Sequence, residues 1–322
     1  MPSTLSVAPW RVFTVEVRAL RRLSPSFLRV TFTGPDLDRF ADNGYDQRIK
    51  LALPLGGSAV AELPDGPDWY QRWRALPEDS RNPIRTYTVR AVRPYAQEVD
   101  VDLVLHGDGG PATRWARRAR PGDRLAIVGP DAGYHGVHGG VEFQPPPAGT
   151  LLLAGDETAA PAICAILERL PADAHGQAMI EVPDPADALP VAAPPGVTVT
   201  WLPRADGAHG SRLGPAVAAV AAELLPTPEP VPALAGAVVT GPATLTGAAA
   251  GVGVGGALVE VDVDRDILWE VPTPADPAPL YAWLAGEASM IRNLRRHLVA
   301  ERGLDRGAVA FMGYWRLGRT AD

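Results

Sequence analysis

Two short segments in the first half of the chain combine residue types that could hold a phosphate-bearing ligand. Residues 85–90 (Arg-Thr-Tyr-Thr-Val-Arg) alternate like a β-strand, which places Arg85 and Tyr87 on one face and both threonines on the other. Residues 106–116 (His-Gly-Asp-Gly-Gly-Pro-Ala-Thr-Arg-Trp-Ala) lead from a strand through a glycine-rich turn into a short helix, where backbone N–H groups can approach a phosphate. Taken one by one, surface salt bridges and an ordinary turn would also explain these segments.

A third segment, residues 150–163, joins an apolar run to a polar turn and an Ala/Leu-rich helix. The turn contains Asp156 and Glu157, whose charges suit a helix N-terminus and could also face a ligand. We expect Thr158 to cap this helix and Pro161 to lie in its first turn. The two acids have a structural explanation and a functional one, and both can hold at once.

The elements that must position the first two segments are short strands bounded by Pro, Gly or Asp. Six strands with little helix predict an antiparallel barrel. An insertion at 56–83 carries Trp69, Tyr70 and Trp73, which we expect to plug one end of the barrel, with the wall of a pocket as the alternative. The expected strands are residues 11–22, 27–33, 47–53, 85–92, 98–105 and 124–128.

The third segment opens a series of alternating strands and helices, which implies an α/β domain with a parallel sheet. The proline run at 145–147 is a plausible linker, so we place a barrel domain at 1–147 and an α/β domain at 148–322. No Gly-x-Gly-x-x-Gly follows the first strand, and the glycines at 251–256 are expected to form a loop. Strands are expected at 150–154, 177–182, 197–202, 280–285 and 308–314, and helices at 161–170, 214–225 and 287–302.

Composition excludes several classes of protein. The 322-residue chain has a formal charge of -7, without the basic runs of a nucleic-acid-binding protein. Its single cysteine, Cys164, is expected in the core, and no cluster suggests a structural metal. The start lacks the features of a signal peptide, so we expect a cytoplasmic protein. Residues 230–259 carry no charge, but their prolines and glycines argue against a membrane-spanning helix.

Taken together, the motifs resemble a known family. Residues 85–90 and 106–116, followed by Pro-Gly-Asp-x-Leu-x-x-x-Gly-Pro at 121–130, resemble the flavin domain of the siderophore-interacting proteins. Residues 155–163 are similar to that family's Gly-Asp-Glu-Thr-Ala-Leu-Pro-Ala-Ile, with Ala160 in place of Leu. Matching segments follow in order at 283–288, 292–298 and 313–318.

The resemblance implies a fold, an activity and cofactors. The family comprises FAD-dependent ferric-siderophore reductases in the ferredoxin-reductase-like group, in which a flavin-binding barrel precedes a nicotinamide-binding α/β domain. The implied reaction takes a hydride from NAD(P)H to FAD and then single electrons to Fe(III), releasing Fe(II) from the siderophore. Two alternatives remain: a flavin or ferredoxin-type reductase with another acceptor, and a siderophore-binding protein without electron transfer. We expect a monomer without a nucleic-acid partner.

The resemblance also implies which residues contact the flavin. Arg85 would lie on the pyrophosphate, Tyr87 beside the ring and Thr88 near the reactive edge, which makes Thr88 a catalytic candidate. Trp315 would cover part of the FAD or simply pack at the end of the last strand. The remaining implied flavin contacts are Thr86, His106, Gly110, Ala112, Thr113 and Thr158.

The nicotinamide side would be formed at the carboxyl edge of the sheet. Asp156 and Glu157 are catalytic candidates there, and the implied nicotinamide-binding residues are Gly155, Asp156, Glu181, Gly286 and Glu287. Glu181 and Asp184 could bind ribose hydroxyls and repel a 2′-phosphate, which favours NADH. Residues Arg204 and Arg212 could instead receive that phosphate, which would favour NADPH.

Lys50 is the one lysine among 30 basic residues. It lies in a segment that resembles the family's barrel strand presenting a basic residue to the substrate pocket. We therefore assign Lys50 to substrate binding, as a contact for an anionic ferric siderophore. The charge distribution agrees with this assignment, because the part before residue 148 has a formal charge of +2 and the remainder -9.

Overall fold

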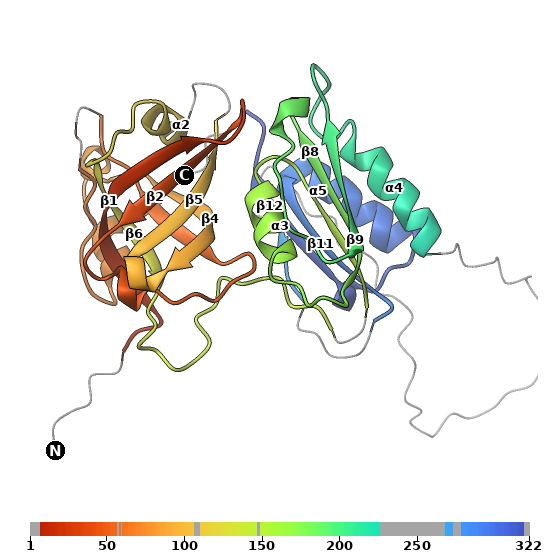
Figure 1. The fold of residues 1–322 in the computed structure, drawn as a ribbon, viewed down its shortest axis with the longest axis horizontal. Helices are drawn as coiled ribbons and strands as arrows, with labels where there is room; N and C mark the ends of the chain where they lie inside the picture. The colour runs from red at the N-terminus through yellow and green to blue at the C-terminus, as the bar shows by residue number, and fades with distance from the viewer. Residues whose placement is uncertain are drawn as a thin grey trace, which may run out of the picture.

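The computed structural model describes residues 7–56, 58, 60–105, 110–146, 149–225, 268–272 and 278–318. Figure 1 shows two domains side by side, a barrel in red to yellow and an α/β domain in green to blue. The domain boundary that the sequence predicts at 147/148 falls between the last barrel strand and the first strand of the second sheet.

In the described part of the first domain there are six strands and two short α-helices. They are β1 (Trp10–Arg22), β2 (Phe27–Thr33), β3 (Arg48–Ala52), β4 (Ile84–Arg93), β5 (Glu98–Val104), β6 (Arg124–Pro130), α1 (Trp69–Arg74) and α2 (Pro111–Ala116). The strands pair antiparallel in the order β1-β2-β5-β4-β3-β6 and close, which confirms the predicted barrel. Inward apolar side chains such as Phe13 and Val30 fill it. Trp115 of α2 stacks on Phe32, so α2 covers part of this core.

The second domain is a six-stranded sheet with helices on both faces. Its elements are β7 (Thr150–Gly155), α3 (Ala160–Leu167), β8 (His175–Val182), β9 (Gly196–Pro203), α4 (Leu213–Leu224), β10 (Trp269–Glu270), β11 (Leu280–Glu287), α5 (Ala288–Arg295) and β12 (Val309–Trp315). The order is β10-β12-β11-β7-β8-β9, and all neighbours are parallel except β10, which pairs antiparallel with β12. The predicted α/β domain with its parallel strands is confirmed, and β10 makes the sheet mixed.

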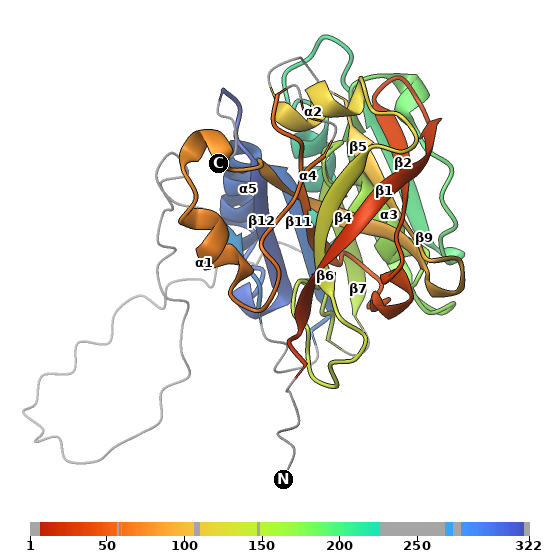
Figure 2. The same ribbon diagram turned by 90° about the vertical axis from the view of Figure 1, so that its left-hand side faces the viewer.

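The two faces of this sheet have different neighbours. Helices α4 and α5 pack on one face through residues such as Val217 and Ile291. Helix α3 packs on the other face through Ile163 and Ile166, in a core that also takes in Phe27 from the barrel. Helix α3 therefore lies between its own sheet and the barrel, next to β4, as Figures 1 and 2 show.

Some expectations differ from the structure. Ala159, and not Thr158, is the N-cap of α3, since the Thr158 side chain binds Asp156 instead; Pro161 does lie in the first turn. The helix expected up to residue 302 changes to a π-helix at Arg296–Glu301. Cys164 is buried, as expected. The glycines at 251–256 and the uncharged stretch 230–259 lie outside the described residues.

The insertion with three aromatic residues does not plug the barrel, so that prediction is wrong. None of the residues of α1 is buried. Its rings pack on one another at the surface, with ring centroids 5.4 Å apart for Trp69 and Tyr70 and 5.7 Å apart for Tyr70 and Trp73. The alternative, a pocket wall, applies to Trp69, which lines a cavity described below.

Buried carboxylates from each domain hold the two domains together. Asp187, on the loop after β8, accepts hydrogen bonds from Ser24 and Ser26 of the barrel at 2.6–2.8 Å. In the opposite direction, Asp46 of the barrel accepts from the Trp283 indole of β11 at 3.1 Å. Two ion pairs add to this interface: the half-buried pair of Arg90 with Glu168 and the more exposed pair of Arg169 with Asp42.

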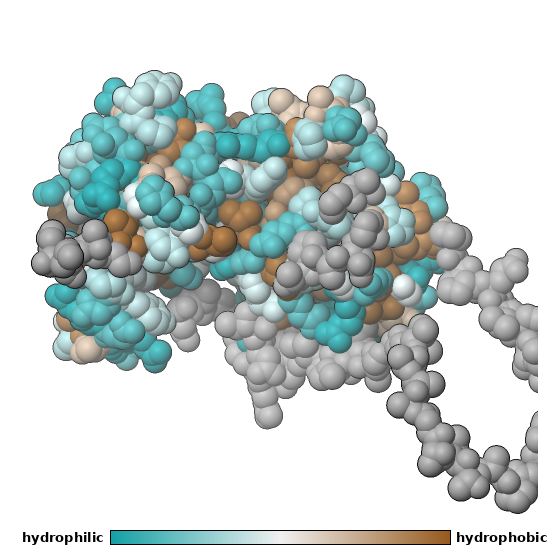
Figure 3. Space-filling view, turned by 90° about the horizontal axis from the view of Figure 1, so that it is seen from below, coloured by the Kyte–Doolittle hydropathy of each residue, from teal (hydrophilic) through white to brown (hydrophobic). Residues whose placement is uncertain are grey.

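The surface shown in Figure 3 is mostly hydrophilic, with hydrophobic residues in separate small groups. Among the described residues, no helix is long and apolar enough to cross a membrane.

Candidate functional site

The Arg-Thr-Tyr-Thr motif forms the first half of β4, next to β3. Tyr87 packs against the barrel core, and burial raises the pKa of its hydroxyl. Thr86 is exposed, whereas Thr88 is almost fully buried. In register, Thr86 lies opposite Lys50 and Thr88 opposite Arg48, so the motif strand and the basic strand share one outer face of the barrel.

The glycine-rich segment ends at α2. Gly110 is the N-cap of this helix, in extended conformation, and among the described residues a Cβ there would meet no atom within 4 Å. Ala112 packs against the same barrel core as Tyr87, and Thr113 is buried. His106 lies outside the described residues.

At the carboxyl edge of the second sheet, the carboxylate of Asp156 is fully buried and holds three segments together. One oxygen accepts from the backbone N–H and the hydroxyl of Thr158, at 2.9 and 2.5 Å. The other accepts from the Glu287 N–H and the Trp315 indole, both at 2.8 Å. Burial, together with the neighbouring charge of Glu157, raises the pKa of Asp156 to about 6.

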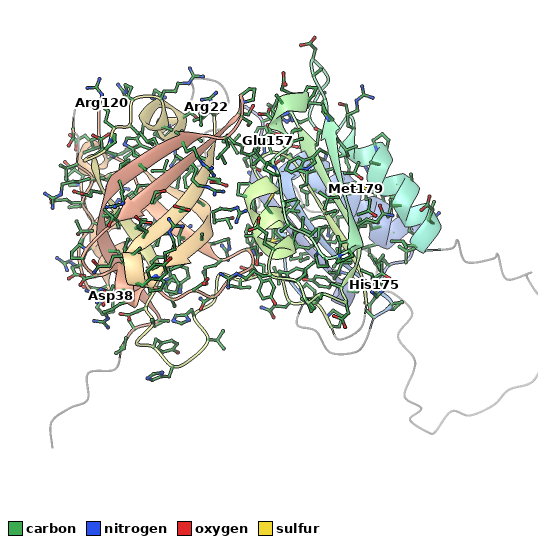
Figure 4. All side chains as sticks on the ribbon, viewed as in Figure 1. Arg22, Asp38, Arg120, Glu157, His175 and Met179 are labelled. Atoms are coloured by element: carbon green, nitrogen blue, oxygen red, sulfur yellow. The ribbon has the colours of Figure 1, made fainter. Side chains whose placement is uncertain are left out.

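Glu157 is also fully buried, and Figure 4 shows it on the side of the second domain that faces the barrel. Arg204 donates to both of its oxygens at 2.7 Å and lies 3.8 Å from Glu181. The Glu181 carboxylate accepts the backbone N–H groups of Gly210, Arg212 and Leu213 at 2.7–2.9 Å, at the start of α4. Glu181 and Arg204, which the sequence assigned to the ribose or its phosphate, are therefore bound to protein groups in this structure.

The remaining residues of this edge surround Asp156. A Cβ on Gly286, whose φ is +150°, would lie 2.7 Å from the Asp156 carboxylate, so this position requires glycine. Gly155 is equally confined, because a Cβ there would lie 2.6 Å from the Ala285 carbonyl oxygen. Glu287 caps α5 by accepting the Met290 N–H at 2.9 Å. The structure thus brings together Gly155, Asp156, Glu157, Thr158, Gly286, Glu287 and Trp315.

Sequence reasoning did not indicate His209. Its ring packs edge-on against Trp315, with centroids 4.8 Å apart, and its Nδ1 lies 4.0 Å from Glu157. Nδ1 is buried and has no hydrogen-bond partner among the described residues. A chain distance of more than 100 residues separates His209 from Trp315, and no motif connects them.

The two halves of the candidate site meet where β4 packs against α3. Arg90, four residues after Thr86 on β4, forms a double hydrogen bond with Glu168 at the C-terminal end of α3, at 2.7 and 2.5 Å. This confirms the structural explanation for Arg90. The polar turn 155–158 immediately precedes α3, and β4 packs against α3. This helix therefore connects the polar turn with the motif strand.

A cavity of about 210 Å³ opens on the outer face of β3. Lys50 lines it, and its ammonium donates to the Thr86 hydroxyl at 2.7 Å. Burial and the charge of Arg48 lower the pKa of Lys50. Arg48 also lines the cavity, forms an ion pair with Glu142 and stacks over the Trp269 ring at 4.4 Å. Sequence reasoning missed Trp10, which lines the same cavity from β1.

Comparisons with known proteins agree with the motifs. A model described as the siderophore-interacting FAD-binding domain matches residues 16–134, and one for the siderophore-interacting protein family matches residues 148–318. An uncharacterized protein of Mycobacterium tuberculosis is 34% identical over 310 residues, 95% of this chain and 91% of the relative. The ferric vibriobactin reductase of Vibrio cholerae is 36% identical over 207 residues, 64% of this chain and 70% of that protein.

Solved structures show the same relationship. A siderophore utilization protein from T. fusca superposes with a TM-score of 0.68 at 29% identity, covering 98% of this chain and 97% of that one. The siderophore-interacting protein SipS from Aeromonas hydrophila gives 0.63 at 30%, covering 96% and 93%. A ferredoxin reductase of carbazole 1,9a-dioxygenase gives 0.57 at 14%, covering 96% and 69%, which shows a ferredoxin-reductase-like fold. The chain belongs to the siderophore-interacting protein family and carries that family's FAD-binding domain.

Proposed function

We propose that this protein is a ferric-siderophore reductase that uses NAD(P)H and FAD. In the overall reaction, NAD(P)H loses a hydride, two ferric ions each gain one electron, and one proton is released. Fe(II) binds hard oxygen ligands less strongly than Fe(III), so it leaves the siderophore. The observation that carries the proposal is the basic cavity of Lys50, which lies directly against the motif strand β4 in a chain of this family.

The residues around β4 and α2 fit FAD. Among the described residues, a Cβ on Gly110 would meet no atom within 4 Å beside the first turn of α2, where backbone N–H groups suit a phosphate. Arg85 would bind the pyrophosphate, Tyr87 would lie along the ring, and Thr88 would hydrogen-bond its reactive edge. When bound, FAD accepts two electrons as a hydride and passes electrons on one at a time.

In this proposal, the acids of the carboxyl edge position other groups. Asp156 fixes the Trp315 indole and the start of α5, because its four hydrogen bonds leave its carboxylate committed to protein donors. Glu157 and Glu181 act in the same way through Arg204 and the N-terminus of α4. The nicotinamide would then lie against Gly286 and Trp315, which Asp156 holds in place.

We propose NADH as the electron donor. Asp184 is exposed just beyond the end of β8, where its charge would repel a 2′-phosphate. Arg212 is exposed as well and would attract one. The ratio of kcat/KM for NADH to that for NADPH decides between them, and a preference for NADPH that disappears in Arg212→Ala would refute the proposal.

The visible spectrum of the FAD-loaded protein tests the function. Anaerobic NADH should bleach the flavin absorption, and a ferric siderophore should then restore it, with one NADH consumed for every two ferric ions reduced. Bleaching without reoxidation by the iron complex would exclude the proposed acceptor and favour a reductase for a protein or for free flavin. A protein that NADH never bleaches would be a siderophore-binding protein. We place the activity in the cytoplasm, in a monomer.

A further inference from the structure

The loop that joins β9 to α4, residues 204–212, reaches across the carboxyl edge of the second sheet. In the strand order, β8, β7 and β11 lie between β9 and β12. His209 of this loop nevertheless packs against Trp315 at the end of β12. The two side chains therefore meet over the edge at which open α/β sheets bind their ligands.

Buried carboxylates anchor the loop at both ends. At the β9 end, the Arg204 guanidinium donates to both oxygens of Glu157 at 2.7 Å. At the α4 end, Glu181 accepts the N–H of Gly210 at 2.7 Å. Gly210 has a φ of +82°, and a Cβ there would come within 3.0 Å of the Met290 side chain, so this position favours glycine. The backbone on both sides of His209 is therefore fixed, and the loop itself presents the imidazole to Trp315.

The imidazole of His209 is held incompletely in this position. Its Nδ1 is buried and has no hydrogen-bond partner among the described residues, and the Glu157 carboxylate, at 4.0 Å, is too far away to serve as one. A buried polar atom without a partner costs free energy. Because 25% of the side chain is exposed, a rotation outward would bring Nδ1 to water and remove this cost. The contact with Trp315 is therefore one that the molecule can release.

The place that His209 covers is the one in which the proposed nicotinamide site lies. The Trp315 indole is fixed by its hydrogen bond to Asp156 at 2.8 Å, and Gly286 lies beside the same carboxylate. The His209 ring meets the indole edge-on, with centroids 4.8 Å apart and planes at 78°. Imidazole and nicotinamide are both flat aromatic rings, and such rings pack favourably against an indole. The part of the indole that one of them covers is closed to the other.

We propose that His209 competes with the nicotinamide ring for Trp315, occupying that place in the free protein and turning away when the dinucleotide binds. The inference rests on the proposed function for the identity of the ligand. A competing contact lowers the apparent affinity by the fraction of molecules in which it is closed. For a single pair of aromatic rings we expect a reduction of about fivefold. His209 would thus set the affinity for the nicotinamide end of the dinucleotide and leave the adenosine end unaffected.

Isothermal titration of the FAD-loaded protein with NAD⁺ and with ADP-ribose tests the competition. NAD⁺ carries no hydride to transfer, so binding is measured without reduction of the flavin, and ADP-ribose lacks the nicotinamide ring. His209→Ala should bind NAD⁺ about fivefold more tightly than the parent and ADP-ribose with unchanged affinity. His209→Phe, which keeps a ring, should bind NAD⁺ no more tightly than the parent. Ser211→Ala, at an exposed position of the same loop, is the matched control and should bind both ligands like the parent.

Nuclear magnetic resonance of the same protein gives a readout that does not depend on affinity. The Trp315 indole N–H signal, identified by its loss in Trp315→Phe, should shift in His209→Ala. In the parent, NAD⁺ should shift the imidazole signals of His209, whereas ADP-ribose should leave them in place. Imidazole signals that stay unchanged when NAD⁺ binds would show that His209 does not turn away. Far-UV circular dichroism shows whether each variant folds.

The possible failures are distinguishable. If His209→Ala binds NAD⁺ with equal or lower affinity than the parent, or if neither protein binds it, the competition is wrong. Tighter binding of both NAD⁺ and ADP-ribose would also overturn it, because the loop would then block the whole dinucleotide. If His209→Ala gains affinity for NAD⁺ alone but the parent reduces no ferric siderophore with NADH, the inference stands and the proposed function fails. If the parent reduces ferric siderophores and the affinity is unchanged in His209→Ala, only the inference fails.

Discussion

The two charged regions of this molecule treat their charges in opposite ways. At the carboxyl edge of the second sheet, Asp156, Glu157 and Glu181 are completely buried, and protein donors occupy their oxygens. In the barrel cavity, the ammonium of Lys50 is half-buried and has one neutral hydroxyl as its partner. The first region uses its charges to hold backbone and side chains in place. In the second, the charge has no acidic partner within 4.0 Å among the described residues, as the proposed binding of an anionic ligand requires.

This difference indicates which substitutions should lower stability and which should weaken ligand binding. A buried carboxylate that accepts several hydrogen bonds contributes to the architecture, and its loss leaves buried donors unpaired. A desolvated cation without an acidic partner costs stability, and we propose that Lys50 serves binding. The following four predictions test this division.

The largest effect is expected for Arg204→Met. This change leaves Glu157 buried without its cation, which should cost about 3–5 kcal/mol of unfolding free energy. Urea unfolding followed by circular dichroism measures the loss. Replacing both partners by methionine should recover most of it, and Arg212→Met, at an exposed position nearby, should stay within about 0.5 kcal/mol of the parent. A loss below about 1 kcal/mol for Arg204→Met would show that the cluster is not architectural.

The same division predicts a pH dependence at the domain interface. Burial raises the pKa of Asp46 from 3.8 to about 6, although Trp283 and two backbone N–H groups donate to it. Between these values the folded state keeps a proton that the unfolded state releases, so stability falls as pH rises. The advantage of the parent over Asp46→Asn should therefore shrink between pH 4 and 7 by up to about 3 kcal/mol, at 1.36 kcal/mol per pH unit. An advantage that grows with pH in urea unfolding would contradict this.

Gly286→Ala tests whether the Asp156 carboxylate must stay where it is. The new Cβ would meet that carboxylate at 2.7 Å and the Met290 side chain at 2.9 Å, in a backbone conformation with φ of +150°. We expect a loss of about 1–3 kcal/mol and a higher KM for NADH. Gly214→Ala is the control, since a Cβ there meets no atom of the described residues within 4 Å and its helix should gain about 0.5 kcal/mol. Equal effects of the two substitutions would mean that the position of Asp156 is adjustable.

The smallest effect on stability is expected for Lys50→Met, within about 0.5 kcal/mol of the parent. In contrast, the KM for a ferric siderophore that the parent reduces should rise about tenfold, the equivalent of about 1.4 kcal/mol. Steady-state kinetics and urea unfolding of the same preparation give both values. Unchanged KM and kcat for every ferric siderophore would remove Lys50 from the substrate site.

Most of the fold could be predicted, because its elements leave local signals. All six barrel strands follow from apolar alternation between turn residues, within one or two residues at most ends. The two-residue strand β10 was missed because it is too short for any periodicity, and the π-helix at 296–301 because it has the same apolar spacing as a helix.

The motifs of the candidate site could be predicted from the sequence. Most of the contacts that their side chains make could not. The sequence indicates Asp156 and Glu157, but their partners come from far along the chain, and nothing near Glu157 indicates a contact with Arg204, which is 47 residues away. Trp10 and Trp69 illustrate the same limit, since neither belongs to a motif. Tertiary packing brings such residues together, and local sequence carries no record of it.

The order of strands in the two sheets has a consequence for biosynthesis. All six barrel strands are complete by Pro130, so the barrel can close while the remainder is still being translated. In the second sheet, β7 can pair with β8 early. Its other neighbour, β11, is synthesised only more than 100 residues after β7. Asp156 gains its last hydrogen bond only when Trp315 has been made. During synthesis, all strands of the barrel are therefore present well before the residues that complete the carboxyl edge of the second sheet.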